Sequence, residues 1–337
     1  MTSDESDTEP DNGFGDDEGL TYAETGVDID ASEDATAALL EAFGSGLKTE
    51  YAGLLDIGDR YLALATDGVG TKLLVAEAMD DYSTIGIDCI AMNVNDLVAA
   101  GVEPVAFVDY LAIDEPDDGL TAEIGEGLAV GLEEANLTLL GGETAVMPEV
   151  VTGFDLAGTC AGLALKDEIL EGEAAVGDAL VGFPSNGIHS NGLTLAREAV
   201  TRNHAYTDTF PLDPEVTIGE ELLRPTRLYT HLLEPMRRHG VRAAAHVTGG
   251  GWTNLLRMGE HRYVIEDPLP SHPIFEFVAE EGNVSDEEMY RTFNMGTGLV
   301  VALESEAAEA MVAETDGQLV GHVEDGASVE IRGLSLS

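Results

Sequence analysis

The chain has 337 residues, of which 65 are Asp or Glu and 15 are Lys or Arg, so its formal net charge is −50. Because 44% of the residues are hydrophobic, the chain can form a buried core, which excludes simple disorder. The excess of carboxylates repels phosphate backbones and acidic membrane surfaces, so neither nucleic acid nor membrane is expected as a partner.

Lysine is the most depleted basic residue, since only Lys48, Lys72 and Lys166 are present. An acidic, lysine-poor surface is typical of proteins from a salt-rich cytoplasm, where strong screening allows dense carboxylates to hold water and keep molecules apart. No apolar run approaches about 18 residues, and the N-terminus lacks a basic segment followed by an apolar one. We therefore expect a cytoplasmic location.

The two cysteines, Cys89 and Cys160, lie far apart in apolar surroundings. Two cysteines are too few for a disulfide framework or a structural zinc site. Both are therefore predicted to be thiols of the core.

The amino-terminal half begins with an acidic segment and continues with alternating predicted strands and helices. Residues 1–20 carry 8 acidic and no basic side chains, which predicts a disordered tail. Hydrophobic periodicity then predicts, in chain order, a strand at 61–66, a helix at 88–100, a strand at 105–112, a helix at 120–135 and strands at 137–140 and 154–165.

The polar segment 171–178 is the best candidate for a linker. The elements predicted after it are a strand at 179–183, helices at 193–200 and 218–239, a strand at 241–247, a short helix from Trp252, a strand at 298–303, a helix at 306–315 and two short strands. Pro225 lies near the start of the second of these helices. The predicted fold class is α/β (mixed α+β), with one domain at 21–168 and a second at 169–337.

The segment 67–72 follows the first strand and combines a carboxylate, two glycines and a cation. Triphosphate chemistry needs a carboxylate for Mg²⁺, room for backbone amides and a positive charge, which Asp67, Gly68, Gly70 and Lys72 could supply. The segment is not a Walker A loop. The alternative is an Asp-capped turn with a solvated lysine, but a lysine kept in a lysine-poor chain favours function.

The helix at 88–100 has a polar face. At 100° per residue, Asp88, Asn93, Asn95 and Asp96 lie opposite its apolar side chains. Asparagine is a poor helix former, so its use here favours metal or nucleotide ligation by Asn95 and Asp96. A solvated helix face is the alternative.

Three further carboxylates stand at or in predicted strands. Glu143 follows a Gly-Gly turn, where it can reach a ligand. Asp109 and Asp155 interrupt apolar strands, and a charge in such a position is costly unless it is paired or bound to a metal. Pairing with an arginine is the alternative for Asp109.

Basic residues gather at 202–262, a stretch with 8 basic and 7 acidic side chains. Arg224 and Arg227 are candidates for a phosphate-binding fork, with salt bridges as the alternative. Arg237 and Arg238 fit the carboxy-terminal end of a helix dipole.

Two histidines stand at junctions between strands and helices. His189 and His246 could transfer protons or donate to phosphate there, or they could be hydrogen-bonded structural residues. Neither a GxSxG elbow nor an HExxH motif occurs, so hydrolase functions lack support.

Taken in order, these motifs resemble the phosphoribosylformylglycinamidine cyclo-ligase (AIR synthetase) family. The matching segments are YAETGVDIDA at 22–31, TDGVGTKL at 66–73, TIGIDCIAMNVNDLVAAGVEPVAFVDYLA at 84–112, GGETAVMP at 141–148, FDLAG at 154–158, SNGIHSNGLTL at 185–195, RPTRLY at 224–229, HVTGGG at 246–251 and EMYRTFNMGTG at 288–298. Many motifs in register are far more specific than one glycine turn.

The resemblance implies ATP-dependent cyclisation of formylglycinamidine ribonucleotide to 5-aminoimidazole ribonucleotide, with release of ADP and phosphate, in purine biosynthesis. It also implies a homodimer, two domains that are each a mixed sheet flanked by helices, and Mg²⁺ beside ATP, with K⁺ as a further candidate ion. By this likeness the metal ligands are Asp67, Asp96 and Glu143.

The remaining roles follow from the same likeness. The nucleotide would be bound by Asp67, Gly68, Gly70, Thr71, Lys72, Asn95, Gly141, Gly142 and Glu143. The substrate would be bound by Ser190, Asn191, Arg224, Arg227, Thr248, Gly249 and Gly250, and catalysis would use His189, His246 and Lys72. One departure is that the family's long glycine-rich segment, expected to fold over ATP, is shortened here to residues 44–56.

Proteins of the same architecture are the nearest alternatives. A selenophosphate synthetase needs a cysteine before Cys89, a hydrogenase-maturation dehydratase needs a carboxy-terminal one, and the formylglycinamidine synthetase large subunit needs a longer chain. A thiamine-phosphate kinase matches in size, but the segments at 224–229 and 288–294 do not suit it. A non-catalytic nucleotide-binding protein with the same fold is the remaining alternative.

Overall fold

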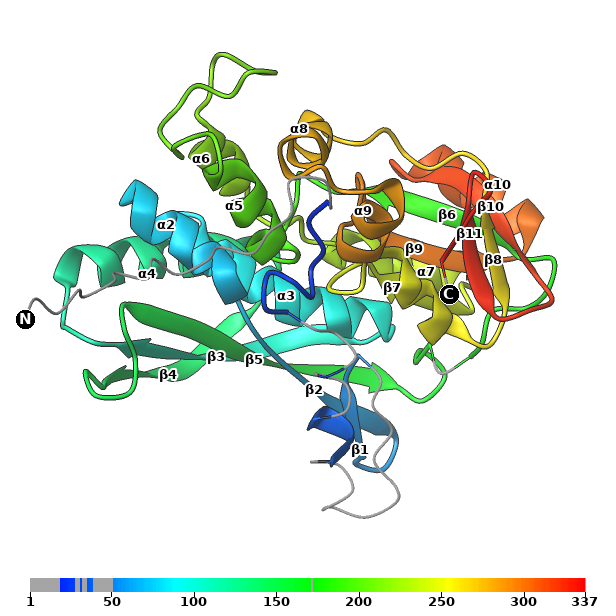
Figure 1. Cartoon of the computed structure of the whole chain (residues 1–337). Helices are drawn as coiled ribbons and strands as arrows, with labels where there is room; N and C mark the ends of the chain where they lie inside the picture. Colours follow the sequence, from blue (N-terminus) through cyan, green and yellow to red (C-terminus); the bar gives the residue numbers. More distant parts are fainter. Residues whose placement is uncertain (1–18, 28–30, 32–34, 39–50, 171, 337) are drawn as a thin grey trace, which may run out of the picture.

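The computed structural model describes residues 19–27, 31, 35–38, 51–170 and 172–336. Two sheets, one in each half of the chain, confirm the mixed α/β class (Figure 1). The strands of the first sheet are β1 (Gly53–Asp56), β2 (Arg60–Gly68), β3 (Glu103–Ile113), β4 (Thr138–Val146) and β5 (Phe154–Leu165). Those of the second are β6 (Ala179–Pro184), β7 (Ala243–His246), β8 (Arg262–Ile265), β9 (Thr297–Leu303), β10 (Gln318–Glu324), β11 (Ser328–Ile331) and β12 (Leu334–Leu336).

The first sheet has the order β1-β2-β5-β3-β4, with β3 and β4 parallel and the other neighbours antiparallel. Helix α3 (Ile85–Ala99) packs on β2 and β5 and against helix α4 (Asp118–Glu134), so one face of the sheet is covered. Helix α2 (Leu73–Met79) follows the turn after β2. The opposite face carries exposed apolar side chains, which are Leu64, Val108 and Tyr110 among others.

Helix α3 lies between the first sheet and the carboxy-terminal domain (Figure 1), and nearly all its residues are buried. Glycines permit its close contact with α4, since a Cβ atom at Gly86 would lie 2.1 Å from the backbone nitrogen of Leu128. The polar face predicted for this helix is therefore turned toward the second domain and away from solvent.

The second sheet has the order β12-β11-β8-β10-β6-β9-β7. The helices of this half are α5 (Leu193–Thr201), α6 (Ile218–Leu222), α7 (Leu233–His239), α8 (Pro273–Gly282), α9 (Asp286–Thr292) and α10 (Ser305–Glu314), and short 3₁₀ segments lie at Thr230–Leu232 and Gly251–Met258. A third such segment, Gly70–Lys72, precedes α2 in the first domain.

The prediction of one continuous helix at 218–239 is wrong. Thr217 and Glu220 form a capping box that starts α6, but α6 ends at Leu222, and α7 begins only at Leu233. Pro225 explains the break, because proline lacks an amide donor and forces the preceding residue out of helical geometry. Residues 224–229 consequently form an irregular, largely buried connection.

Other predicted bounds need smaller corrections. The strand predicted at 137–140 runs on through the GGET segment to Val146, and the chain ends in three short strands where two were predicted. β1, α2, β8, α8 and α9 were not predicted. Of the predicted tail, residues 1–18 lie outside the described residues, whereas Leu20 is buried and its amide donates to the Gly282 carbonyl at 3.1 Å.

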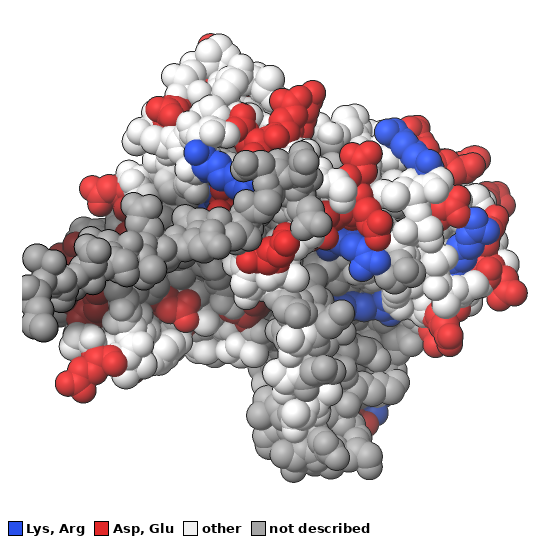
Figure 2. Space-filling model, viewed as in Figure 1, with Lys and Arg blue, Asp and Glu red and all other residues white. Residues whose placement is uncertain are grey.

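The surface and core agree with the composition. Carboxylates are spread over the face shown in Figure 2, with few lysines or arginines among them. Cys89 and Cys160 are buried free thiols, as predicted. Among the described helices, each is too short or too polar to cross a bilayer.

Candidate active site between the two domains

The candidate site lies where the end of β2 and helix α3 meet the carboxy-terminal domain. Asp67 is the next-to-last residue of β2, and its backbone carbonyl accepts a hydrogen bond from the Asn93 side chain at 3.2 Å. One turn further along α3, an oxygen of Asp96 lies 2.9 Å from Nδ1 of His246, which ends β7. The two aspartates predicted to bind metal therefore lie near the same part of α3: Asp67 beside Asn93, and Asp96 one turn later on the helix.

The pKa of Asp67 is raised to about 6, first by burial and second by the negative charge of Asp96. The amide of Gly68 donates to Asp67 at 2.8 Å and opposes this rise. Nearby, the buried Oδ1 of Asn93 has no hydrogen-bond partner among the described residues. Two close carboxylates and an unpaired amide oxygen are the hard oxygen ligands that Mg²⁺ prefers, so these residues fit a divalent cation.

The turn at 67–72 lies against the loop at 189–192. The hydroxyls of Thr71 and Thr194 are 2.9 Å apart, and a Cβ atom at Gly70 would be 3.9 Å from the Ser190 carbonyl. Gly192 has φ of 75°, and a Cβ atom there would lie 2.4 Å from the Phe293 ring, so only glycine fits. The predicted nucleotide turn and a predicted substrate loop are therefore adjacent.

A second predicted substrate loop, at 248–250, lies beside the first. The Asn191 side chain lies 3.8 Å from the Met92 sulfur on α3, and its Oδ1 would be 3.4 Å from a Cβ atom at Gly249. Thr248 and Gly250 belong to the tight turn that starts the segment Gly251–Met258, and Gly250 has φ of 92°. The structure thus brings Asn191 and the loop at 248–250 to the amino-terminal domain.

His189 is buried in a left-handed conformation with φ of 68°, which is uncommon for a residue other than glycine. Its Nε2 accepts hydrogen bonds from the amides of Asn186 at 3.2 Å and Arg227 at 3.4 Å. Burial lowers the pKa of His189 well below its usual value, and neighbouring cations lower it further. A neutral ring with its proton on Nδ1 fits these contacts.

Lys72 and Asn95 are placed differently from their predicted roles. The Lys72 ammonium is fully buried and contacts Asp88 at 2.7 Å and the Arg224 carbonyl at 2.6 Å. Asn95 is also fully buried, and its amide bonds the backbone of Arg227. The ligand roles predicted for both stay predictions, but their polar atoms are turned toward the second domain.

The predicted phosphate fork is engaged in ion pairs. The Arg224 guanidinium contacts Glu221, and that of Arg227 contacts Asp316. This is the salt-bridge alternative that the sequence left open.

Glu143 lies on the other side of the sheet from Asp67 and Asp96. The register pairs Asp67 with Gly158, Gly158 with Asp109, and Asp109 with Gly142, so these positions share the face covered by α3. Glu143 pairs with Tyr110 and therefore belongs to the exposed face, where it follows Gly141 and Gly142 within strand β4. Among the described residues no three acidic, histidine or cysteine side chains gather as a metal site, so the predicted triad is not assembled within one chain.

Two contacts at the site had no sequence signal. The Tyr51 hydroxyl donates to the His246 carbonyl at 3.4 Å, and the Arg257 guanidinium lies 5.0 Å from the centre of the Tyr51 ring. Burial raises the pKa of Tyr51. Tyr51 and Arg257 belong to no sequence motif, so only the fold reveals that Tyr51 contacts His246 and that Arg257 packs on Tyr51.

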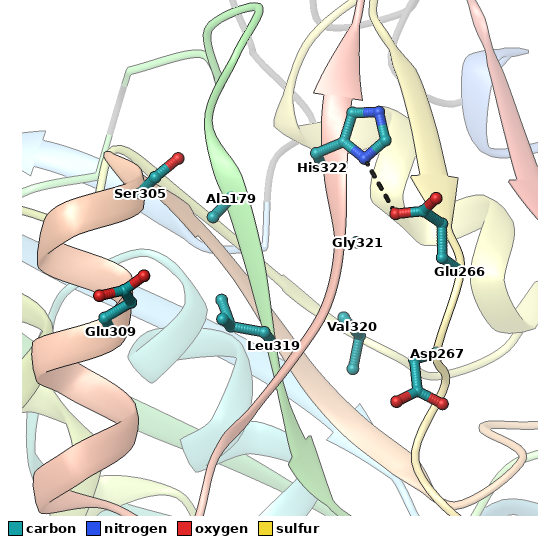
Figure 3. A pocket seen from close by; sticks show the side chains of 9 residues that line it. All are labelled: Ala179, Glu266, Asp267, Ser305, Glu309, Leu319, Val320, Gly321 and His322. Atoms are coloured by element: carbon teal, nitrogen blue, oxygen red, sulfur yellow. Dashed lines mark ion pairs between the residues drawn. The ribbon is translucent and has the colours of Figure 1, made fainter.

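A pocket of about 300 Å³ lies elsewhere, on the second sheet (Figure 3). Its walls carry Glu266, Asp267 and Glu309, and the ring of His322 pairs with Glu266 at 3.6 Å. All its residues come from the carboxy-terminal domain, remote from α3, and none belongs to a predicted motif.

Comparisons with known proteins agree with the two-sheet division. The model of the AIR synthase related protein N-terminal domain matches residues 49–164, and that of the C-terminal domain matches residues 175–333. A thiamine monophosphate kinase from Aquifex aeolicus shares the fold, with a TM-score of 0.67, 16% identity and coverage of 92% of this chain and 99% of that one.

Curated relatives are far more similar. The phosphoribosylformylglycinamidine cyclo-ligase of Methanococcoides burtonii is 46% identical over 94% of this chain and 98% of its own length. That of Methanosarcina barkeri is 48% identical over 92% of this chain and 97% of its own length. Identity of this level along nearly the whole chain, together with both domain matches, shows that the chain belongs to the phosphoribosylformylglycinamidine cyclo-ligase family.

Proposed function

We propose that the protein closes the imidazole ring of 5-aminoimidazole ribonucleotide from formylglycinamidine ribonucleotide, with hydrolysis of ATP to ADP and phosphate. The observation that carries this proposal is the meeting of three motifs of the family, at 67–72, 189–192 and 246–250, around helix α3. The alternative of a thiamine-phosphate kinase is not favoured, because its support is a likeness of fold alone.

In this proposal, Asp67 and Asp96 hold Mg²⁺ with the nucleotide, beside the backbone amides of Gly68, Gly70 and Thr71. Their carboxylate oxygens and the raised pKa of Asp67 support the assignment, because a cation would relieve the repulsion between them. When bound beside Mg²⁺, ATP would supply the phosphoryl group that activates the formamide oxygen of the substrate. K⁺ is a further candidate ion.

The substrate is proposed to lie against Ser190, Asn191 and the loop at 248–250. His246 orients Asp96 through the hydrogen bond at 2.9 Å, and the neutral ring of His189 holds the backbone of Arg227. Catalysis would then depend mainly on positioning and on stabilisation of charge, with the amidine nitrogen placed to attack the activated carbon.

We propose further that two copies pair through the exposed face of the first sheet. Its exposed apolar side chains support this, since 40% of Val108 and 42% of Tyr110 are exposed and monomers rarely leave a sheet face of this kind uncovered. Glu143 lies on the same face, paired with Tyr110. In a dimer, Glu143 would serve the site of the second copy, which would reconcile its predicted role with its position.

The domain division at 21–168 and 169–337 remains part of the proposal, as does adaptation to a salt-rich cytoplasm. The surface charge supports the latter, because its self-repulsion is tolerable only where salt screens it.

The test is release of ADP by the purified protein in molar KCl with Mg²⁺ and ATP. The proposal requires that release depend on formylglycinamidine ribonucleotide and that 5-aminoimidazole ribonucleotide appear in equal amount. ADP release that is independent of this substrate, or that depends on thiamine phosphate, would overturn it.

A further inference from the structure

The irregular segment at 224–229 lies between helix α3 and the loop at 189–192, and its Thr226, Leu228 and Tyr229 are buried although it forms no helix or strand. Buried backbone groups must find hydrogen-bond partners, and here the amino-terminal domain supplies them. Lys72 donates to the Arg224 carbonyl at 2.6 Å, and Asn95 donates to the Arg227 carbonyl at 2.8 Å.

Three further hydrogen bonds are donated by the segment to side chains of helix α3. The amide and hydroxyl of Thr226 donate to one oxygen of Asp88 at 2.7 and 2.6 Å. The Tyr229 amide donates to Oδ1 of Asn95 at 3.0 Å. Asn95 therefore bonds both an acceptor and a donor of the segment, because its carboxamide carries an NH₂ donor and an oxygen acceptor. We call Lys72, Asp88, Asn95 and the segment 224–229 the interdomain clasp.

A fully buried ion pair lies at one end of the clasp. Lys72 and Asp88 are 2.7 Å apart and neither side chain is exposed. Burial lowers the pKa of Lys72, and the charge of Asp88 opposes this. Among the described residues, the ion pair to Asp88 is the one salt bridge of Lys72, so removal of either charge leaves the other buried and unpaired.

The clasp also touches the residues that the proposed site uses. The Thr226 hydroxyl lies 3.3 Å from that of Ser190, and the Arg227 amide donates to His189 at 3.4 Å. On α3, Asn95 directly precedes Asp96, whose oxygen contacts His246. Thr226, Arg227 and Asn95 of the clasp therefore connect the substrate loop to the part of α3 that carries Asp96.

We infer that Lys72, Asp88 and Asn95 are positioning residues that lock the two domains in one arrangement, and that Lys72 does so in place of binding phosphate. For its catalytic consequence this inference rests on the proposed function. It predicts that the site is preassembled, because the loops at 189–192 and 246–250 are held against α3 before any ligand arrives.

The decisive variants are Lys72→Met and Lys72→Met/Asp88→Asn. Methionine removes the charge at similar length, and asparagine keeps an oxygen for Thr226 while removing the charge left unpaired. The matched control is Lys166→Met, since Lys166 is a half-exposed lysine that pairs with Asp56 at 2.6 Å.

Each variant is measured in three ways: amide hydrogen exchange at Thr226 and Tyr229, the Kd for a non-hydrolysable ATP analogue with Mg²⁺, and kcat. In Lys72→Met we expect exchange at least about tenfold faster, a Kd within about twofold of the wild type and a lower kcat, because the clasp loosens while the nucleotide contacts persist. The double variant should recover protection and most of kcat, and Lys166→Met should change none of the three.

If Lys72 bound the phosphates of the nucleotide, its variants would behave differently. A Kd raised by about tenfold or more with unchanged exchange, or a double variant that recovers protection but not kcat, overturns the inference. If Lys72→Met does not fold, the double variant alone decides. Exchange and analogue binding do not require turnover, so they test the clasp even if the proposed reaction fails.

Discussion

The Nδ1 atom of His246 lies 2.9 Å from a carboxylate oxygen of Asp96, although 150 residues separate them in the chain. This contact joins the carboxy-terminal end of β7 to helix α3 and so couples the loop at 248–250 to the proposed metal ligand. The histidine is fully buried, whereas 21% of the aspartate side chain is exposed. His246 thus holds one oxygen of Asp96 while part of the carboxylate stays accessible, as the proposed metal-binding role requires.

Asp96→Asn should lower substrate-dependent ADP release by about 100-fold or more, because the proposed Mg²⁺ ligand loses its charge. Stability should change little, since asparagine can still bond His246. Steady-state kinetics with saturating Mg²⁺ would measure the effect. The control is Asp267→Asn in the pocket of Figure 3, where 89% of the aspartate is exposed and wild-type rates are expected. Equal losses in both variants would contradict the assignment.

Asp67→Asn should stabilise the protein without Mg²⁺ while abolishing turnover. The pKa of Asp67 is raised from 3.8 to about 6, so at neutral pH its ionisation opposes folding by about 2 to 3 kcal/mol. Above pH 6 the group is ionised in both the folded and the unfolded state, and the full cost is present. As the pH falls from about 6 to about 4, the folded state takes up the proton first and the cost disappears.

The difference in unfolding free energy between Asp67→Asn and the wild type should therefore be largest at pH 7 and shrink toward pH 4. Chemical denaturation in KCl with EDTA would measure it. A variant less stable than the wild type at pH 7 would show that burial does not strain this carboxylate.

If two copies pair as proposed, Val108→Asp should convert the dimer to a monomer, because it places a charge in the exposed sheet face. Sedimentation velocity in molar KCl measures the state. Val130→Asp is the matched control, since Val130 lies on α4 and is 51% exposed, compared with 40% for Val108. An unchanged dimer in Val108→Asp would place the interface elsewhere.

Asp96→Asn and Glu143→Gln should complement each other when mixed. If each site takes Asp96 from one copy and Glu143 from the other, half of the randomly mixed dimers are heterodimers with one intact site. About a quarter of the wild-type activity then returns. The measurement is ADP release after the two inactive variants are unfolded together and refolded. No recovery would mean that both residues serve one chain's site, whereas an active Glu143→Gln protein would show that Glu143 has no part in it.

The free energy of unfolding should rise with KCl concentration. Most of the gain should come below about 1 M, because the Debye length has fallen to about 3 Å at that concentration and further salt adds little screening. The net charge of −50 makes self-repulsion large in dilute buffer. Thermal unfolding monitored by circular dichroism from 0.1 M upward would check this order-of-magnitude expectation. A Tm that is independent of salt would remove the support for salt adaptation.

The sequence alone predicted the features that depend on local pattern. Periodicity placed α3, β3, α4, β5 and α5 within a few residues of their bounds, because helix and strand periods are read from neighbouring positions. The motifs at 67–72, 189–192 and 246–251 identified the family, since the match required only their identity and order. The buried cysteines followed from their apolar surroundings.

Only the tertiary structure decided how the polar side chains are used. Lys72 and Asn95 carry the residue types of ligands, yet partners 152 and 132 residues away turn them into the clasp. Glu143 sits in a motif of the right kind, but strand register places it on the opposite face from Asp67. A sequence pattern records which groups can bond, whereas the choice among distant partners is made when the two domains pack and every buried polar group must be satisfied.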